Sequence, residues 1–273
     1  MSSESEQTAF PPQEAARTSG TESSMDPSPD VIRAGYKGAS KLKGKVTVIT
    51  GGDSGIGRSV AVHFAREGAA AVVVVFHKSG TDAAETERMV TKEGAKCLLI
   101  QGDVGDSSFC NKVVEDTVKE YGRLDVLVNN AAEQHPVDDI TAMDPVNIQK
   151  TFATNIYSQI FMCRAAWPHL KRGSSIINTS SVNAYAGHSQ LLDYTATKGA
   201  ITSFTRALHM AAVSSGIRVN SVAPGPIWTP LIPATFPDEK VRRTVRHICT
   251  AASQCGRATA HPCTKPVRCK KEN

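Results

Sequence analysis

A tyrosine and a lysine stand four residues apart, at Tyr194 and Lys198. On a helix two such side chains share a face, and Ile201, Phe204 and Leu208 continue beside it as an apolar stripe. A neighbouring ammonium favours the phenolate and so lowers the pKa of a tyrosine from its usual value of about 10. Such a phenol can transfer a proton near neutral pH. An amphipathic helix with a lysine at its margin would show the same spacing, so both interpretations stand at this point.

Hydroxyl and amide side chains follow two stretches that read as strands. Ser181 comes after Ser175–Asn178, and Asn129 opens the run Asn-Asn-Ala-Ala after Val126–Val128. The carboxyl ends of parallel strands are where open α/β sheets bind ligands, so the Ser181 hydroxyl could bond a substrate oxygen. Both groups are also ordinary turn residues. Asn155 lies within a predicted helix, although asparagine has a low helix propensity, and this hints at a role beyond helix formation.

A glycine-rich turn is written at residues 50–57 as TGGDSGIG. It follows a short apolar run and precedes a helical pattern, and its glycines are Gly51, Gly52, Gly55 and Gly57. Glycines let the backbone approach a diphosphate, and the free N–H groups at the helix start can bind that anion. The spacing is G-x-x-x-G-x-G. The strand before it and the helix after it favour dinucleotide binding over a plain tight loop.

The residues at the end of the next strand do not decide between NAD and NADP. An acidic side chain that binds the ribose of NAD is expected about 20 residues after the turn, but Val74–Lys78 contains no carboxylate. His77 and Lys78 could accept the extra phosphate of NADP, or they could belong to a solvated loop. The cofactor is therefore NAD or NADP.

The elements that must position these residues alternate between strand and helix. Strands are predicted at Val46–Thr50, Ala71–Phe76, Cys97–Gln101, Val126–Val128, Ser175–Asn178 and Arg218–Val222. Helices are predicted at Gly55–Glu67, Asp82–Glu93, Ser107–Tyr121, Pro145–Leu170 with an interruption, and Asp193–Val213. This alternation predicts an α/β, Rossmann-like, doubly wound parallel sheet with helices on both faces.

The two ends of the chain differ in composition from the middle. Residues 1–40 are rich in Ser, Glu, Pro and Thr and are predicted to be a flexible extension. Residues 41–240 form the expected dinucleotide-binding domain, in which the proline-rich stretch Pro224–Pro237 is expected to be a loop that acts as a lid. Residues 241–273 show no strand-like run and are expected to be a disordered or aberrant tail.

Charge and cysteine content separate the tail from the domain. The net charge of +5 arises from Lys240 onward, where nine Lys and Arg residues face one acid. Residues 1–239 carry a net charge of −3, which argues against a specific nucleic-acid surface on the domain. Cysteines 249, 255, 263 and 269 in the tail are spaced unlike a structural zinc site, so no metal is expected. An untemplated, disordered segment explains them better.

Localisation follows from what the sequence lacks. No apolar run approaches the roughly 20 residues that span a bilayer, and the opening MSSESEQTAFPPQ has no secretory apolar core. Cys97, Cys110 and Cys163 lie in apolar surroundings and read as buried thiols of a reducing compartment. We therefore expect a cytoplasmic protein that binds no membrane.

Taken together, these motifs resemble the short-chain dehydrogenase/reductase family. The resemblance rests on the turn at residues 50–57, Asn-Asn-Ala-Ala at 129–132, Asn155, Ser181, the pair Tyr194 and Lys198, and Pro-Gly at 224–225 followed by Thr229, in the family's order. Stretches such as GGDSGIGR and LLDYTATKGAI are most similar to its glucose and ribitol dehydrogenase homologues. The resemblance implies an enzyme that interconverts an alcohol, such as a sugar or polyol, and a carbonyl with NAD or NADP.

The resemblance also implies residue roles. Tyr194 would be the general acid/base, Lys198 would lower the pKa of that phenol and hold the nicotinamide ribose, Ser181 would orient the substrate oxygen, and Asn155 would secure a water. Thr229 would meet the nicotinamide carboxamide. The whole cofactor set is Gly51, Ser54, Gly55, Ile56, Gly57, Asp103, Val104, Asn129, Ala131, Tyr194, Lys198, Pro224, Gly225, Ile227 and Thr229.

The end of the chain departs from the family pattern. After the lid, family members continue with a helix, a seventh strand and a glycine-containing segment, none of which is visible beyond about Val241. The sheet is therefore expected to lack its last strand, and the homo-oligomer typical of the family is placed in doubt. An alternative function follows, in which a Rossmann-like protein binds a dinucleotide or a protein partner without catalysis.

Overall fold

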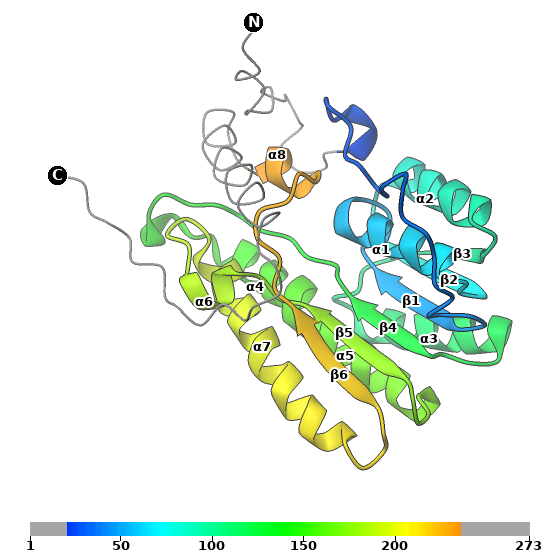
Figure 1. The fold of residues 1–273 in the computed structure, drawn as a ribbon. Coiled ribbons are helices and arrows are strands. Elements are labelled where there is room, and N and C mark those ends of the chain that lie inside the picture. Colours follow the sequence, from blue (N-terminus) through cyan, green and yellow to red (C-terminus); the bar gives the residue numbers. More distant parts are fainter. Residues whose placement is uncertain (1–20, 236–273) are drawn as a thin grey trace, which may run out of the picture.

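The computed structural model describes residues 21–235 of the 273-residue chain (Figure 1). Its centre is a sheet whose neighbouring strands all pair in parallel, in the order β3-β2-β1-β4-β5-β6. The strands are β1 (Val46–Thr50), β2 (Ala71–Phe76), β3 (Lys96–Gln101), β4 (Val126–Asn129), β5 (Ser175–Thr179) and β6 (Arg218–Val222). The predicted Rossmann-like α/β fold is confirmed. Strand order reverses between β1 and β4, the place where such sheets bind ligands.

Helices cover both faces of the sheet (Figure 1). One face carries α1 (Gly55–Arg66) and α2 (Gly80–Lys92), and the other carries α3 (Ser107–Tyr121), α5 (Ser158–Ala166) and α7 (Leu192–Ala212). β2 explains why two layers are needed, because every one of its residues is buried. An unbroken Val-rich strand is stable only where helices cover both of its sides.

The long helical stretch that was expected between Pro145 and Leu170 is interrupted, as predicted. It consists of α4 (Pro145–Phe152), the π-helical turn η3 (Ala153–Tyr157), α5, and the 3-10 turn η4 (Trp167–His169). A π-helical turn inside a helix often marks a functional site. Asn155 lies in the middle of this one.

The stretch after β6 is not wholly a loop. The expected lid was drawn as loop over Pro224–Pro237, but α8 (Leu231–Thr235) is a short helix. Prolines at positions 230 and 233 suggested a loop. They fall at the start of the helix, however, where a missing N–H is tolerated. The Ile232 N–H bonds to the Thr229 carbonyl at 3.1 Å and begins this turn.

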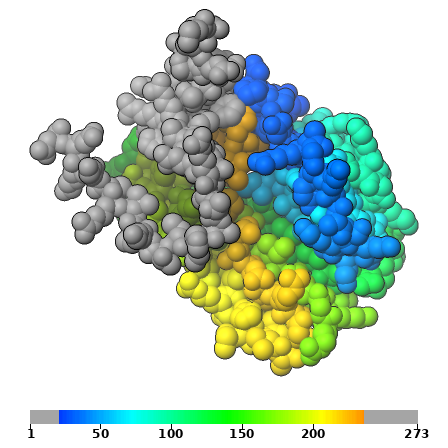
Figure 2. Space-filling view, in the orientation of Figure 1, coloured from blue at the N-terminus to red at the C-terminus, as the bar shows by residue number. Residues whose placement is uncertain are grey.

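Residues 21–40 lie against the domain, although residues 1–40 were expected to form a flexible extension. Glu22 in the 3-10 turn η1 (Glu22–Ser24) and Met25 are each only 5% exposed. Figure 2 shows this blue segment lying next to the orange residues that follow β6. The composition of this segment is polar, so it did not predict burial. Glu22 is buried because it bonds to Gly55, Arg58 and Asp82 of the domain. Residues 1–20 and the expected tail 241–273 lie outside the described residues, so the domain boundaries stay a prediction.

Three further observations bear on the sequence predictions. Cys97, Cys110 and Cys163 are free thiols, of which Cys97 is only half-buried. Within residues 21–235 the sheet has six strands, with β3 and β6 at its edges. None of the helices in this range has the length and apolar character needed to cross a bilayer.

Candidate active site

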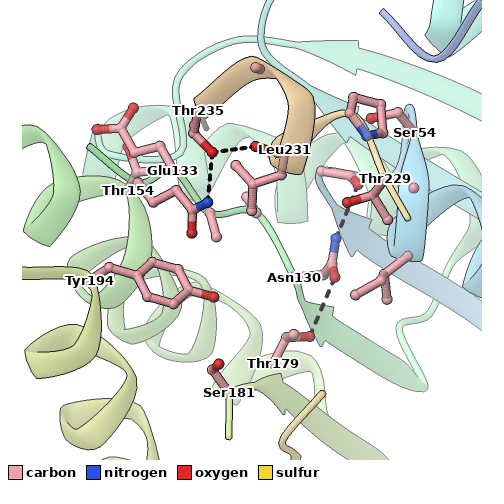
Figure 3. A pocket seen from close by; sticks show the side chains of 18 of the residues that line it. Ser54, Asn130, Glu133, Thr154, Thr179, Ser181, Tyr194, Thr229, Leu231 and Thr235 are labelled. Atoms are coloured by element: carbon pink, nitrogen blue, oxygen red, sulfur yellow. Dashed lines mark hydrogen bonds between the residues drawn. The ribbon is translucent and has the colours of Figure 1, made fainter. Parts of the chain in front are cut away.

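A cavity of about 830 Å³ runs along the carboxyl edge of the sheet (Figure 3). Its walls are the loops that follow all six strands, the first turns of α7, and α8. A volume of this size is typical of a small-molecule site. Because strand order reverses at this edge, residues far apart in the sequence meet in one space.

Tyr194 and Lys198 lie side by side in the wall of this cavity. They are 8% and 1% exposed, and the Lys198 ammonium nitrogen lies 5.2 Å from the centre of the Tyr194 ring. Lys198 Nζ donates to the carbonyl of Thr179 at the end of β5, 2.8 Å away. The phenol of Tyr194 points into the cavity (Figure 3). The structure therefore brings the two groups together, one helical turn apart, at the point where a buried face meets the cavity.

The expected direction of the tyrosine pKa is wrong for this structure. Burial raises the pKa of Tyr194 above its usual value, and hydrogen bonding from Ser181 lowers it only in part. Burial also lowers the pKa of Lys198 to about 7. The reason is that water is excluded from both groups, which disfavours the charged form of each. Proximity in sequence indicated the pair but not this loss of hydration.

Ser181 lies where the sequence predicted, just beyond β5 and 6% exposed. Its hydroxyl faces the cavity near the Tyr194 phenol (Figure 3). The same oxygen accepts a hydrogen bond from the Asn183 N–H at 3.2 Å, so the turn interpretation also holds. One hydroxyl thus shapes the turn and stands beside the phenol.

Asn155 lies outside the lining of the cavity and is fully buried. Its Oδ1 accepts from the Glu133 N–H at 2.8 Å, and its Nδ2 donates to the Glu133 carbonyl at 2.9 Å. Nδ2 also donates to the Thr197 hydroxyl at 3.1 Å, and Thr197 bonds to the Tyr194 carbonyl at 2.7 Å. Asn155 therefore joins the loop after β4 to the helix that carries the tyrosine.

The glycine turn has the tight geometry expected of an anion site. Gly51 and Gly55 have φ values of +61° and +52°, which other residues rarely adopt. A Cβ atom on Gly57 would lie 1.9 Å from the Gly51 carbonyl oxygen, so only glycine fits there. Gly51, Ser54, Gly55 and Ile56 line the cavity, and Gly57 stands behind them.

The prediction that Asn129 belongs to the cofactor set is wrong for this structure, and its neighbour Asn130 faces the cavity instead. Asn129 is 1% exposed, does not line the cavity, and donates to Asn178 Oδ1 at 2.9 Å, which links β4 to β5. Asn130 lines the cavity and donates from Nδ2 to the carbonyls of Thr50 and Gly51 at 3.2 and 3.1 Å. The side chain of Asn130, for which the sequence predicted no role, therefore holds the glycine turn.

The remaining predicted cofactor residues reach the same cavity. Its lining includes Asp103, Val104, Ala131, Pro224, Gly225, Ile227 and Thr229. His77 and Lys78 line it as well, so the basic pair after β2 faces the space rather than lying apart from it. Asp53 also lines it, and burial raises the pKa of this carboxyl.

A group of polar side chains at the tyrosine end of the cavity was not predicted from the sequence. It comprises Glu133, Gln134, His135, Lys150 and His188. His135 Nε2 lies 3.4 Å from Glu133 Oε1, and this contact raises the pKa of His135. Gln134 Nε2 donates to the Thr235 hydroxyl of α8 at 2.8 Å (Figure 3). The rule that ligands lie beyond strand ends would have found residues 133–135, which follow β4, but not Lys150 and His188.

Comparison with known proteins gives one consistent result. The family model described as short chain dehydrogenase matches residues 45–240. General stress protein 39 of Bacillus subtilis is 58% identical over 232 residues, which cover 85% of this chain and 81% of the relative. Glucose and ribitol dehydrogenase of Daucus carota is 49% identical over 239 residues, 86% of this chain and 82% of the relative. A Serratia marcescens short-chain dehydrogenase/reductase mutant structure is similar with a TM-score of 0.67 and 28% identity, over 76% of this chain and 91% of that one.

Proposed function

This chain belongs to the short-chain dehydrogenase family and is an oxidoreductase, and we propose that it interconverts a polyhydroxy alcohol and its carbonyl compound with NAD or NADP. The carrying observation is that Tyr194, Ser181 and Lys198 converge on one wall of the cavity whose other end is the glycine turn. The alternative of a non-catalytic binding protein is not favoured by these findings.

The residues that line the cavity fit a dinucleotide. The start of α1 leaves the N–H groups of its first turn without partners inside the helix, as an anionic diphosphate requires. Gly51 has no room for a side chain because Ala131 packs 3.0 Å from where its Cβ would be. His77, Lys78, Asp103 and Val104 close the end of the cavity on the β2–β3 side. The dinucleotide, when bound, would supply or accept the hydride.

Tyr194 would move the proton that accompanies the hydride. In reduction its phenol donates a proton to the substrate oxygen as the carbonyl becomes an alcohol, and in oxidation its oxygen takes that proton back. The Ser181 hydroxyl lies beside the phenol and would hold the substrate oxygen by a hydrogen bond. Lys198 would stabilise negative charge on the phenol whenever its amine is protonated. Asn155 would keep the helix of Tyr194 in place through Thr197.

The proposed substrate class follows from the tyrosine end of the cavity. Glu133, Gln134, His135, Lys150 and His188 offer both donors and acceptors there. A substrate with several hydroxyls can satisfy such groups, whereas an apolar ketone would leave them without partners. The name of the carrot relative, glucose and ribitol dehydrogenase, supports the same class. A cytoplasmic location stays a prediction, and the homo-oligomer typical of the family stays in doubt for this chain.

Replacing Tyr194 by Phe tests the proposal. We expect kcat to fall about 10²- to 10⁴-fold, because the proton donor is lost, while the dissociation constant for NADH or NADPH stays within about twofold. Tyr185→Phe is the matched control, since Tyr185 is 65% exposed on α6 (Asn183–Ala186) and does not line the cavity. Rates are measured with ribitol, glucose and an apolar ketone. Equal rates for Tyr194→Phe and the parent would remove the proton transfer from this residue.

A further inference from the structure

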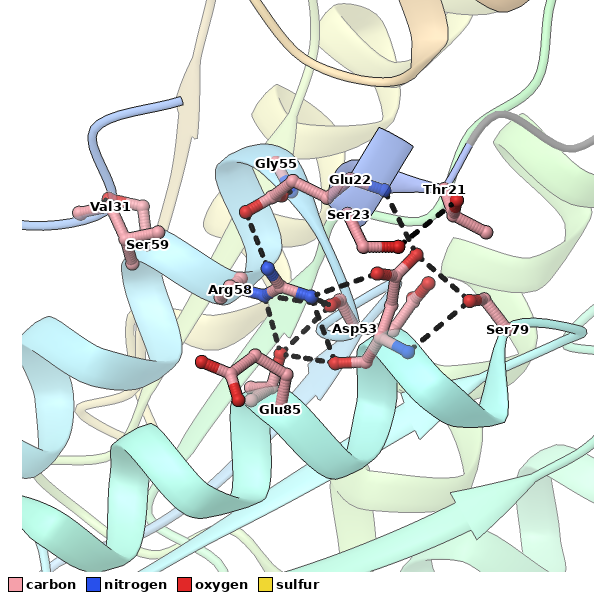
Figure 4. A network of polar contacts seen from close by, with 12 residues as sticks. Thr21, Glu22, Ser23, Val31, Asp53, Gly55, Arg58, Ser59, Ser79 and Glu85 are labelled. Atoms are coloured by element: carbon pink, nitrogen blue, oxygen red, sulfur yellow. Dashed lines mark hydrogen bonds and ion pairs between the residues drawn. The ribbon is translucent and has the colours of Figure 1, made fainter. Parts of the chain in front are cut away.

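We propose that Glu22 is a positioning residue for the dinucleotide and that residues 21–27, here called the strap, brace the glycine turn against the segment after β6. This inference rests on the proposed dinucleotide binding. Glu22 Oε2 accepts a hydrogen bond from the Gly55 N–H at 2.5 Å (Figure 4). Gly55 is the first residue of α1, so the strap holds the end of the helix that faces the cofactor site.

A buried ion pair fixes that carboxylate. Glu22 Oε1 lies 2.5 Å from Arg58 Nη1, and the two side chains are 5% and 6% exposed. The Arg58 guanidinium also donates to the Asp53 carbonyl in the glycine turn, at 2.7 and 3.0 Å, and to the Thr86 hydroxyl at 2.9 Å. Arg58 thus binds the strap, the turn and α2 at once. Arg58 also pairs with the buried Asp82 carboxylate at 3.4 Å, so removing Glu22 leaves the guanidinium with one acidic partner in place of two.

The backbone of the strap is held separately. The Glu22 N–H donates to Asp82 Oδ2 at 3.1 Å, and Asp82 stands in the first turn of α2 (Figure 4). Further along, the Ser59 hydroxyl donates to the Val31 carbonyl at 2.8 Å. The chain therefore follows α1 after it leaves the turn.

The far end of the strap touches the segment after β6. Trp228 Nε1 donates to the Pro27 carbonyl at 2.9 Å. The next residue, Thr229, packs on the turn so closely that a Cβ on Gly55 would lie 3.0 Å from its side chain. Strap, turn and the segment after β6 are thus joined pairwise around Gly55.

This arrangement shapes the anion site without filling it. The strap uses the Gly55 N–H, and the Arg58 guanidinium pairs with the carboxylates of both Glu22 and Asp82. The N–H groups of Ile56 and Gly57 have no acceptor inside the helix. Holding a binding turn in its bound shape lowers the entropic cost of binding. Order in the strap and binding of the dinucleotide must then favour each other, because coupling is reciprocal.

Glu22→Ala in the full chain tests the brace by titration calorimetry with NADH and with NADPH. We expect the dissociation constant of the dinucleotide that binds to rise at least tenfold, with kcat at saturating dinucleotide changed less than about twofold. Glu22→Gln keeps one acceptor oxygen and should recover part of the affinity. Glu85→Gln is the matched control, because Glu85 pairs with Arg88 on the exposed side of α2 and should leave the affinity unchanged.

Trp228→Phe cuts the other end of the strap and covers the case in which Glu22→Ala fails to fold. We expect the dissociation constant of the dinucleotide to rise about threefold in Trp228→Phe. In the parent protein we expect hydrogen exchange of residues 21–36 to become slower when NADH or NADPH binds. The inference would be overturned if Glu22→Ala bound the dinucleotide more tightly than the parent or with an affinity within twofold of it. Unchanged affinity of Trp228→Phe would also overturn it, as would faster exchange of the strap on binding. A parent protein that binds neither dinucleotide would instead overturn the proposed function.

Discussion

Lys198 shows how burial sets the chemistry of single residues in this molecule. Its side chain is 1% exposed and its ammonium has one described hydrogen bond, to the Thr179 carbonyl. Desolvation therefore dominates, and the pKa of Lys198 falls to about 7. The amine is half-protonated near neutral pH, and small changes in its surroundings shift its charge. A bound dinucleotide and substrate would change those surroundings, so the free and loaded sites need not share one pKa.

The lowered pKa of Lys198 predicts a pH-dependent stability of the free protein. Above about pH 7 the folded state has released this proton, whereas the unfolded state keeps it up to its ordinary pKa near 10.4. The unfolded state then binds more protons, so the free energy of unfolding rises with pH in that window, by at most about 1.4 kcal/mol per pH unit. Urea unfolding between pH 7 and 8 without dinucleotide measures it.

Lys198→Met provides the comparison for this prediction. The variant lacks the titrating amine, so its free energy of unfolding should rise less steeply with pH than that of the parent. The thiols of Cys97, Cys110 and Cys163 have pKa values that desolvation raises to about 12, and they act in the opposite direction as pH rises above 8. Both proteins contain them, and the difference between the two slopes isolates the lysine. Identical slopes would show that Lys198 keeps its proton in the folded state.

Two local elements place the reactive groups with unusual backbone geometry. The glycine turn brings the start of α1 to the cavity, and Asn130 fastens that turn to the loop after β4. The π-helical turn η3 carries Asn155, whose amide joins Glu133 to Thr197. The turn is joined to the loop after β4, and η3 joins that same loop to α7, so a change in either element should move the site as well as destabilise the fold.

Gly57→Ala tests the turn. The new methyl group would lie 1.9 Å from the Gly51 carbonyl oxygen, so the turn must open. We expect dinucleotide affinity to fall at least tenfold and the free energy of unfolding to drop by about 1–3 kcal/mol, the usual range for overpacking. Thermal unfolding and calorimetric titration with NADH and NADPH measure the two effects.

Gly80→Ala is the matched control for the turn. Gly80 opens α2, and nothing lies within 4 Å of where its Cβ would be. Alanine should leave affinity unchanged and alter stability by less than about 1 kcal/mol, since helices favour alanine over glycine. If Gly57→Ala behaved like Gly80→Ala, the close approach of the backbone would have no part in cofactor binding.

Within residues 21–235, the apolar interior is divided between two clusters on opposite faces of the sheet. One cluster joins α1 and α2 to the strands, and the other joins α3, α5 and the end of α7. The cavity crosses the edge that both share, with the glycine turn and β2 end on one side and the tyrosine on the other. A ligand that fills it contacts elements packed on both clusters.

This arrangement predicts ligand-linked stability of the whole domain. A dinucleotide present at about 100 times its dissociation constant should raise the free energy of unfolding by about 2.7 kcal/mol. Thermal unfolding with equal concentrations of NADH and NADPH then identifies the cofactor by the larger shift. A larger shift with NADPH would assign His77 and Lys78 to its extra phosphate, and AMP serves as a control for the adenosine end. Absence of any shift with both dinucleotides would contradict the proposed cofactor class.

Much of this architecture could be predicted because it is written in local patterns. Three elements have the bounds that the sequence predicted: the unbroken apolar strand Ala71–Phe76, the periodic helix Ser107–Tyr121 and the strand Arg218–Val222. The spacing of Tyr194 and Lys198 placed both on one helical face, and the strand-end rule placed Ser181 near them. The element bounds and the shared helical face depend on residues within one or two turns of each other, so sequence alone determines them. Ser181 was placed by the general topology of parallel sheets.

Tertiary structure decided what depends on distant partners. The raised pKa of Tyr194 and the lowered pKa of Lys198 follow from how tightly other elements exclude water. Asn129 is buried outside the cavity because it bonds to Asn178 on the neighbouring strand. Glu22 lies in a polar segment whose composition suggested flexibility, yet it pairs with Arg58, 36 residues away. The composition of a segment indicates how it behaves when it is exposed to water. Whether its polar residues become buried depends on partners that the packing of distant parts of the chain brings close.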